Sequence, residues 1–157
     1  MSDYDKSGII WHGDSVDYFQ YATFLPAEYS QRYKVVVEPW PGRMVIDEDL
    51  TSLLAQVDAT YPNLTKKPGM YIASTGGNDF HAWQLDDPNK DWYGPTPSAQ
   101  EIFDHRRGMI DGLRNAHPEI RIITKLVIPF GKSAEDNNKN PESIINAQEY
   151  NQLLYDY

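Results

Sequence analysis

The chain has 157 residues, with 14 Lys and Arg against 23 Asp and Glu, a net charge of -9 and no cysteine. This length fits one domain, residues 1–157, whose core needs neither disulfide bonds nor metal sites for its stability. The acidic balance disfavours nucleic acid and anionic membrane surfaces as partners, because both are bound through basic residues. No apolar stretch approaches the roughly 20 residues of a membrane-spanning helix, and the first residues lack the features of a secretion signal, so the compartment stays open.

The predicted elements of the first half alternate between strands and helices. An apolar run over residues 8–12 predicts a strand, and the polar and aromatic residues 15–24 predict a helix after it. A β-branched run at 35–37 predicts the second strand. Leucine and valine at helical spacing over 50–57 predict the second helix, with the acidic residues 47–49 as its first turn.

The second half continues the alternation. Residues 70–73 predict a strand that enters a long polar and aromatic loop. A capping box at 98–101 precedes an amphipathic helix that extends to about residue 116. The nearly continuous apolar run 122–128 predicts a strand buried on both faces, and the apolar spacing within 143–157 predicts a last helix.

This order predicts an α/β fold with a mostly parallel sheet and helices on both faces. No strand follows the last helix, so we expect the sheet to lack its final strand. If the strand order is 2-1-3-4-5, residues 122–128 then form an exposed apolar edge that invites self-association with a second chain. Ligands of such sheets bind at the carboxyl ends of the strands, where we expect the loops at Gly13, Gly42 and Gly76 to converge.

Three residues at these strand exits are candidates for acyl-transfer chemistry. Ser15 follows Gly13-Asp14 at a strand-to-helix turn, where a helix N-terminus stabilises negative charge; taken alone, Asp14 or Ser15 is more typical of an ordinary helix cap. Gly42 allows its backbone N–H to approach a bound oxygen, and Asn78 has an amide that donates hydrogen bonds. Each of these two is also typical of an ordinary turn. Together the three supply a nucleophile and up to three oxyanion donors.

The same motifs resemble the SGNH hydrolases, also called GDSL esterases and lipases. Residues 9–15 resemble the block with the nucleophilic serine, 41–43 the block with the oxyanion glycine, 76–79 the block with the oxyanion asparagine, and 122–129 the fourth strand. The resemblance implies a flavodoxin-like three-layer α/β/α sandwich. It also implies hydrolysis, without a metal or other cofactor, of an ester of a sugar, a lipid or a small alcohol.

The family's last block, Asp-x-x-His, has no counterpart here, since none of the four histidines follows an Asp by three positions. Without that histidine a serine is a poor nucleophile, so we expect the catalytic Asp and His beyond residue 157 and little activity from residues 1–157 alone. His81, two residues after Asp79, is a less favoured candidate for the general base within residues 1–157. His12 reads as a satisfied core histidine, and His105 and His117 as solvated or helix-end residues. No spacing predicts a metal site.

Aromatic residues at Trp40, Trp83, Trp92 and Tyr93 are candidates for the wall of an acyl or sugar pocket, or for packing that pins the loop to the domain. Two other functions stay open. One is a catalytically inactive SGNH-like binding or structural domain. The other is a flavodoxin-like anion or nucleotide binder, which is disfavoured because Gly13-Asp14-Ser15 is poor in the Ser, Thr and Gly expected there.

Overall fold

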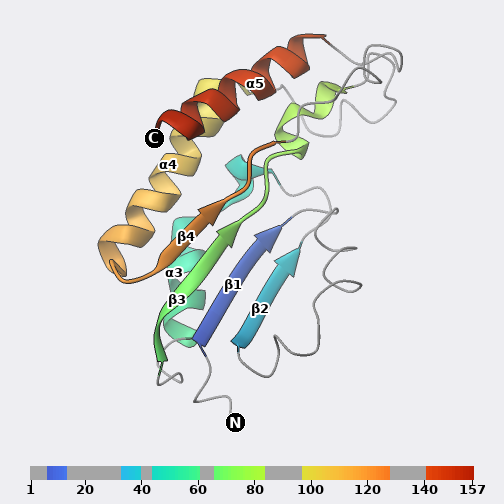
Figure 1. Cartoon of the computed structure of the whole chain (residues 1–157). Coiled ribbons are helices and arrows are strands. Elements are labelled where there is room, and N and C mark those ends of the chain that lie inside the picture. The colour runs from blue at the N-terminus through green and yellow to red at the C-terminus, as the bar shows by residue number, and fades with distance from the viewer. Residues whose placement is uncertain (1–6, 14–32, 40–43, 61–65, 84–96, 128–140) are drawn as a thin grey trace.

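The computed structural model describes six stretches of the chain, residues 7–13, 33–39, 44–60, 66–83, 97–127 and 141–157. Strands and helices alternate through them from residue 33 onward, as the sequence predicts (Figure 1). The elements are β1 (Ser7–Gly13), β2 (Tyr33–Pro39), η2 (Val45–Asp47), α3 (Leu50–Thr60), β3 (Lys66–Ala73), η3 (Asn78–Trp83), α4 (Ala99–Ala116), β4 (Arg121–Thr124) and α5 (Pro141–Asp156).

The four strands form one parallel sheet in the order β2-β1-β3-β4. In the register, Ile10 of β1 lies opposite Val36 of β2 and Tyr71 of β3, and Tyr71 lies opposite Ile122 of β4. Because all strands run the same way, their carboxyl ends meet at one edge of the sheet (Figure 1). The predicted α/β fold with this strand order is confirmed.

One face of the sheet is covered by α3 and α4. Ile10 and Tyr71 point into the same core, since side chains alternate between the two faces of a strand. The helices meet them with Val57 of α3 and Leu113 of α4, and Figure 1 shows α3 behind the sheet. On the opposite face Trp11 is only half-buried. The helix predicted for that face, residues 15–24, lies outside the described residues.

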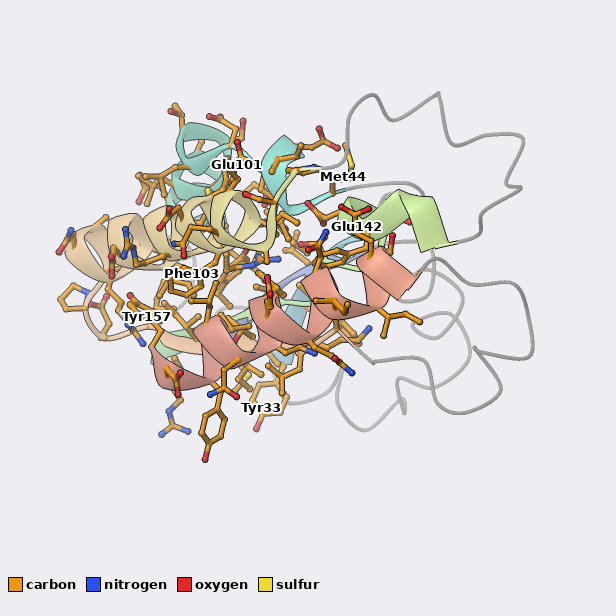
Figure 2. The ribbon with its side chains drawn as sticks, turned by 90° about the horizontal axis from the view of Figure 1, so that it is seen from above. Tyr33, Met44, Glu101, Phe103, Glu142 and Tyr157 are labelled. Carbon is orange, nitrogen blue, oxygen red and sulfur yellow. The ribbon has the colours of Figure 1, made fainter. Side chains whose placement is uncertain are left out.

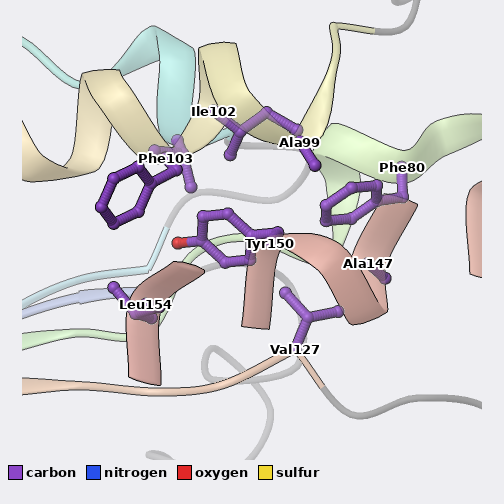
Figure 3. Close-up of a cluster of buried hydrophobic side chains, with 9 residues drawn as sticks. Phe80, Ala99, Ile102, Phe103, Val127, Ala147, Tyr150 and Leu154 are labelled. Carbon is purple, nitrogen blue, oxygen red and sulfur yellow. The ribbon is translucent and has the colours of Figure 1, made fainter. Parts of the chain in front are cut away.

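Helix α4 begins where the capping box predicts. The Ser98 hydroxyl accepts a hydrogen bond from the Glu101 backbone N–H at 3.2 Å, and the Glu101 carboxylate accepts one from the Ser98 N–H at 2.8 Å. Helix α5 packs beside α4, as Figure 2 shows from above, with the rings of Phe103 and Tyr157 edge to face at 6.0 Å. Their shared core has Tyr150 at its centre, with Phe103 on one side and Phe80 and Val127 on the other (Figure 3).

The strand predicted over residues 122–128 is shorter than expected and is not buried on both faces. Strand β4 ends at Thr124, because β3 ends at Ala73 and offers its last carbonyl to the Lys125 N–H at 2.9 Å. Ile123 is 47% exposed and Leu126 is 46% exposed. Among the described strands β4 is an edge, which explains the exposure of its outer side.

Two further details differ from the sequence prediction. The acidic residues 47–49 are not the first turn of α3, which begins at Leu50; Asp49 accepts hydrogen bonds from Ser52, whereas Glu48 is buried. The loop after β3 contains a short helix, η3, whose Phe80 belongs to the core. None of the helices in the described stretches is long and apolar enough to cross a membrane.

Candidate functional site

The exits of β1 and β3 are tied together at the carboxyl edge of the sheet. The Ser74 N–H donates to the His12 carbonyl at 2.9 Å, and the indole N–H of Trp11 donates to the Ser74 hydroxyl at 3.0 Å. Gly76 then turns the chain with φ of 143°, which side-chain-bearing residues rarely adopt. A Cβ there would also lie only 3.0 Å from Cγ2 of Val127. The turn that leads to Asn78 is thus fixed by its backbone and by close packing.

The segment after β2 is held by Asp79, the residue next to Asn78. The Val45 N–H donates to both carboxylate oxygens of Asp79, at 2.9 and 2.8 Å, and the Ile46 N–H lies 3.4 Å from one of them. Asp79 is fully buried. Since Val45 is three residues after Gly42, this contact brings the flank of one predicted oxyanion residue to the flank of the other.

Burial dominates the electrostatics of Asp79. Removal from water raises the pKa of its carboxyl from 3.8 to about 7, against the opposing effects of the Val45 and Ile46 N–H groups and the Arg106 charge. A carboxyl group with such a pKa changes charge near neutral pH. The hydrogen bonds from the Val45 N–H are therefore accepted by a carboxyl group whose protonation depends on pH.

A second buried contact holds the same segment at Glu48. Arg106 of α4 donates through Nη1 to the Glu48 carboxylate at 2.8 Å and through Nη2 to the Thr75 carbonyl at 3.0 Å and hydroxyl at 2.5 Å. The Thr75 hydroxyl in turn donates to Glu48 at 2.5 Å. The three side chains form a closed ring, which we call the Arg106 ring. Burial opposes the charge of Arg106, but the Glu48 carboxylate raises its pKa overall.

Tyr150 of α5 completes the surroundings of the ring. Its hydroxyl interacts electrostatically with the Arg106 guanidinium and is a buried polar atom with no hydrogen-bond partner in the described stretches. Burial raises the pKa of this hydroxyl, while the neighbouring Arg106 charge lowers it. Four segments of the chain, those that hold Glu48, Thr75, Arg106 and Tyr150, therefore meet in one polar cluster within the apolar core.

The three histidines with described side chains occupy structural positions. His12 is buried, with Nε2 2.8 Å from the Gln56 side-chain oxygen and Nδ1 3.4 Å from the Tyr71 hydroxyl, which confirms the prediction of a satisfied core histidine. His117 ends α4 and lies 3.2 Å from Asp58. His105 is not simply solvated as predicted, since its Nε2 donates to the Glu48 carbonyl at 2.8 Å. The side chain of His81 is not described.

The predicted catalytic residues are described only in part. Asn78 is half-buried and begins η3 just beyond β3, at the predicted edge of the sheet. Ser15 and Gly42 lie outside the described residues, so their distances from Asn78 stay predictions. Of the proposed aromatic pocket wall, Trp40, Trp92 and Tyr93 also lie outside them, and Trp83 ends η3 without a described side chain. The described side chains contain no cluster of three or more residues suited to a metal ion.

Sequence reasoning missed the roles of Asp79 and of the Arg106 ring. One signal was available for Arg106, because it interrupts the apolar stripe of α4 between Ile102 and Met109. A charged residue on a buried helix face needs a partner. The partner itself, Glu48, is remote in sequence and lies in a run of acids that the sequence pattern assigned to the first turn of a helix.

Comparison with known proteins supports the fold. No protein-family model and no curated protein sequence matches the chain. Among solved structures, a GDSL-like lipase from Bacteroides thetaiotaomicron is 14% identical with a TM-score of 0.60, and the match covers 96% of this chain and 63% of that one. An acetyl xylan esterase is 15% identical with a TM-score of 0.57, covering 95% and 73%. A variant of an acetyl xylan esterase from Geobacillus stearothermophilus is 16% identical with a TM-score of 0.53, covering 99% and 75%.

The chain therefore has the flavodoxin-like α/β fold of SGNH hydrolases, and the resemblance that its motifs predicted is confirmed at the level of the fold. It spans less than two thirds of the length of the first of these structures. At such identities fold and activity are separate questions, because one fold hosts many functions.

Proposed function

We propose that the protein is a serine ester hydrolase of the SGNH type. Ser15 is the nucleophile, and the N–H groups of Ser15 and Gly42 and the Asn78 amide are the oxyanion donors. The substrate is an ester of a sugar, a lipid or a small alcohol. The chemistry needs no cofactor, and the catalytic Asp and His follow residue 157.

The observation that carries this proposal is the joining of three strand exits by buried hydrogen bonds. Ser74 is bonded to His12, and Asp79 is bonded to Val45. Ser15 is two residues from the end of β1, and two residues of chain reach at most about 7 Å. Gly42 is likewise two residues from Met44, the start of the described segment that Asp79 holds. These contacts favour a nucleophile and its oxyanion donors that share one small region.

In the proposed reaction the Ser15 hydroxyl attacks the ester carbonyl, and its proton passes to the histidine base. The carbonyl oxygen becomes an oxyanion that accepts hydrogen bonds from the three donors. The tetrahedral intermediate then collapses, and the alcohol leaves with the proton from the histidine. Water attacks the acyl-enzyme with the same histidine as base, which releases the acid and restores Ser15.

The test compares hydrolysis of a short activated ester by the protein expressed from its full coding sequence and by two variants. Ser15→Ala is expected to lose nearly all activity, since it removes the nucleophile. Asn78→Ala is expected to lower kcat by about 10²- to 10³-fold, the usual effect of one oxyanion donor. Ser98→Ala, which changes a serine at the exposed start of α4, is the control and should match the wild type.

Equal rates for wild type and Ser15→Ala would remove Ser15 from the mechanism. No hydrolysis by the wild type, combined with saturable binding of acylated sugars, would favour the inactive binding domain instead. An activity that survives Asn78→Ala but not Ser15→Ala would keep the nucleophile and reject the assigned oxyanion donor.

A further inference from the structure

Helix α4 contributes a charged side chain to the interior just beneath the candidate site. The side chains of Arg106 and Glu48 are each 1% exposed. A buried ion pair of this kind adds little net stability, because desolvation offsets the attraction. Stability alone therefore gives a weak reason for placing Arg106 on the apolar stripe of α4. Its position relative to the strand exits offers another reason.

The Arg106 ring connects the two segments that flank the proposed oxyanion donors. Glu48 lies on the segment 44–48 that follows Gly42, and Thr75 lies on the turn that leads to Asn78. Each bond in the ring has a matched donor and acceptor, and Arg106 reaches both segments with a planar group of fixed geometry. The ring therefore sets the distance between the segment 44–48 and the turn at Thr75 from the side of α4.

Two neighbouring contacts reinforce the same spacing. Asp79 holds the segment 44–48 near its beginning through Val45, whereas the ring holds it at its end through Glu48. His105, adjacent to Arg106 on α4, donates to the Glu48 carbonyl at 2.8 Å. The segment is thus fixed at both ends, and one turn of α4 supplies two of the contacts.

We propose that Arg106 is a positioning residue for ester hydrolysis, which fixes the segment after Gly42 against the turn before Asn78 through Glu48 and Thr75. This inference rests on the proposed function, and it assigns no contact between Arg106 and the substrate. Oxyanion donors act only when they are held at the correct separation, and a misplacement of about 1 Å can cost about 100-fold in rate. Loss of the ring should consequently lower kcat more than it changes KM.

The main test removes the whole ring with side chains of similar size, in the variant Glu48→Leu/Thr75→Val/Arg106→Met. Apolar replacement of an entire buried ion pair often preserves stability, whereas removal of one partner leaves a buried charge. A milder variant, Arg106→Lys, keeps the charge but loses the planar fork. Arg107→Met is the matched control, since Arg107 is an exposed neighbour on α4 that pairs with Asp104.

Urea unfolding first establishes that each variant is folded at the assay temperature. The triple variant is expected to lose roughly 10- to 100-fold in kcat, with KM within about 2-fold of the wild type. The kcat of Arg106→Lys is expected to lie between those of the wild type and the triple variant. Arg107→Met should keep the wild-type constants. A folded triple variant with the wild-type kcat would overturn the proposal and leave the ring a purely structural role. If the triple variant does not fold, Arg106→Lys decides in the same way.

Failure of this inference and failure of the proposed function give different results. Ser15→Ala with the wild-type rate rejects the proposed function and this inference with it. Loss of activity in Ser15→Ala, combined with full kcat in the folded ring variants, rejects only the positioning role of Arg106.

Discussion

Replacement of Asp79 by asparagine is expected to remove a pH dependence of stability that the wild-type chain carries. Asp79 is fully buried and accepts hydrogen bonds from the backbone N–H groups of Val45 and Ile46. Burial raises the pKa of the carboxyl from 3.8 to about 7. Between these two values the folded chain holds a proton at Asp79 that the unfolded chain has released.

The sign follows from proton linkage. Because the folded state binds the extra proton, the free energy of unfolding falls as pH rises from about 4 to about 7, and it changes no further once both states are ionised. A pKa raised from 3.8 to about 7 corresponds to at most about 4 kcal/mol between the ends of this range. Asparagine keeps the size of the side chain and an acceptor oxygen but cannot titrate.

Urea unfolding at intervals from pH 4 to pH 8 measures the effect. Other groups titrate in this range, so the informative quantity is the difference in unfolding free energy between Asp79→Asn and wild type. That difference should move in favour of the variant by up to about 4 kcal/mol as pH rises. Asp104→Asn, which changes an exposed carboxylate on α4, is the control and should follow the wild type. Parallel curves for Asp79→Asn and wild type would refute the reasoning.

Two other predictions concern packing and assembly. Gly108→Ala should raise stability by about 0.5–1 kcal/mol, since alanine favours a helix and the added methyl meets open space. Gly112→Ala should stabilise the protein less than Gly108→Ala, or destabilise it, in thermal unfolding, because its Cβ would lie 2.3 Å from Leu50. When Gly112→Ala is instead added to a Leu50→Ala protein, it should raise stability relative to Leu50→Ala alone. When residues 1–157 are produced alone, β4, an edge among the described strands, should promote self-association at high concentration, which Ile123→Lys should reduce in sedimentation measurements; a concentration-independent monomer would contradict this.

The parts of the fold that depend on local pattern were predictable from the sequence. Helix α4 followed from an apolar stripe and a capping box, both of which are properties of nearby residues. The length of β4 was not predictable in this way, because the apolar run continues past Thr124 while its partner strand ends at Ala73. A strand ends where its neighbour ends, and no pattern within residues 122–128 contains that information.

In the candidate site too, features set by local pattern were predictable and features set by tertiary contacts were not. Asn78 follows a predicted strand and lies near the carboxyl ends of the strands, as predicted. The role of Glu48 depends on Arg106, which is 58 residues away in the chain. The sequence pattern assigned Glu48 to the acidic first turn of the following helix, because acidic residues there interact favourably with the helix dipole. Only the tertiary packing of α4 against the segment after β2 turns the same residue into a buried partner.

The polar contacts of α4 also limit how this helix can be exchanged or redesigned. An apolar stripe alone would tolerate a slide of one turn, about 5.4 Å, with other leucines and isoleucines taking the vacated places. His105 and Arg106 do not permit that shift, since they donate hydrogen bonds to Glu48 and Thr75, which lie on segments outside the helix. A graft of a foreign helix at this position would need the same two side chains in the same phase. Libraries that randomise α4 should accordingly hold these two positions constant and vary the exposed side freely.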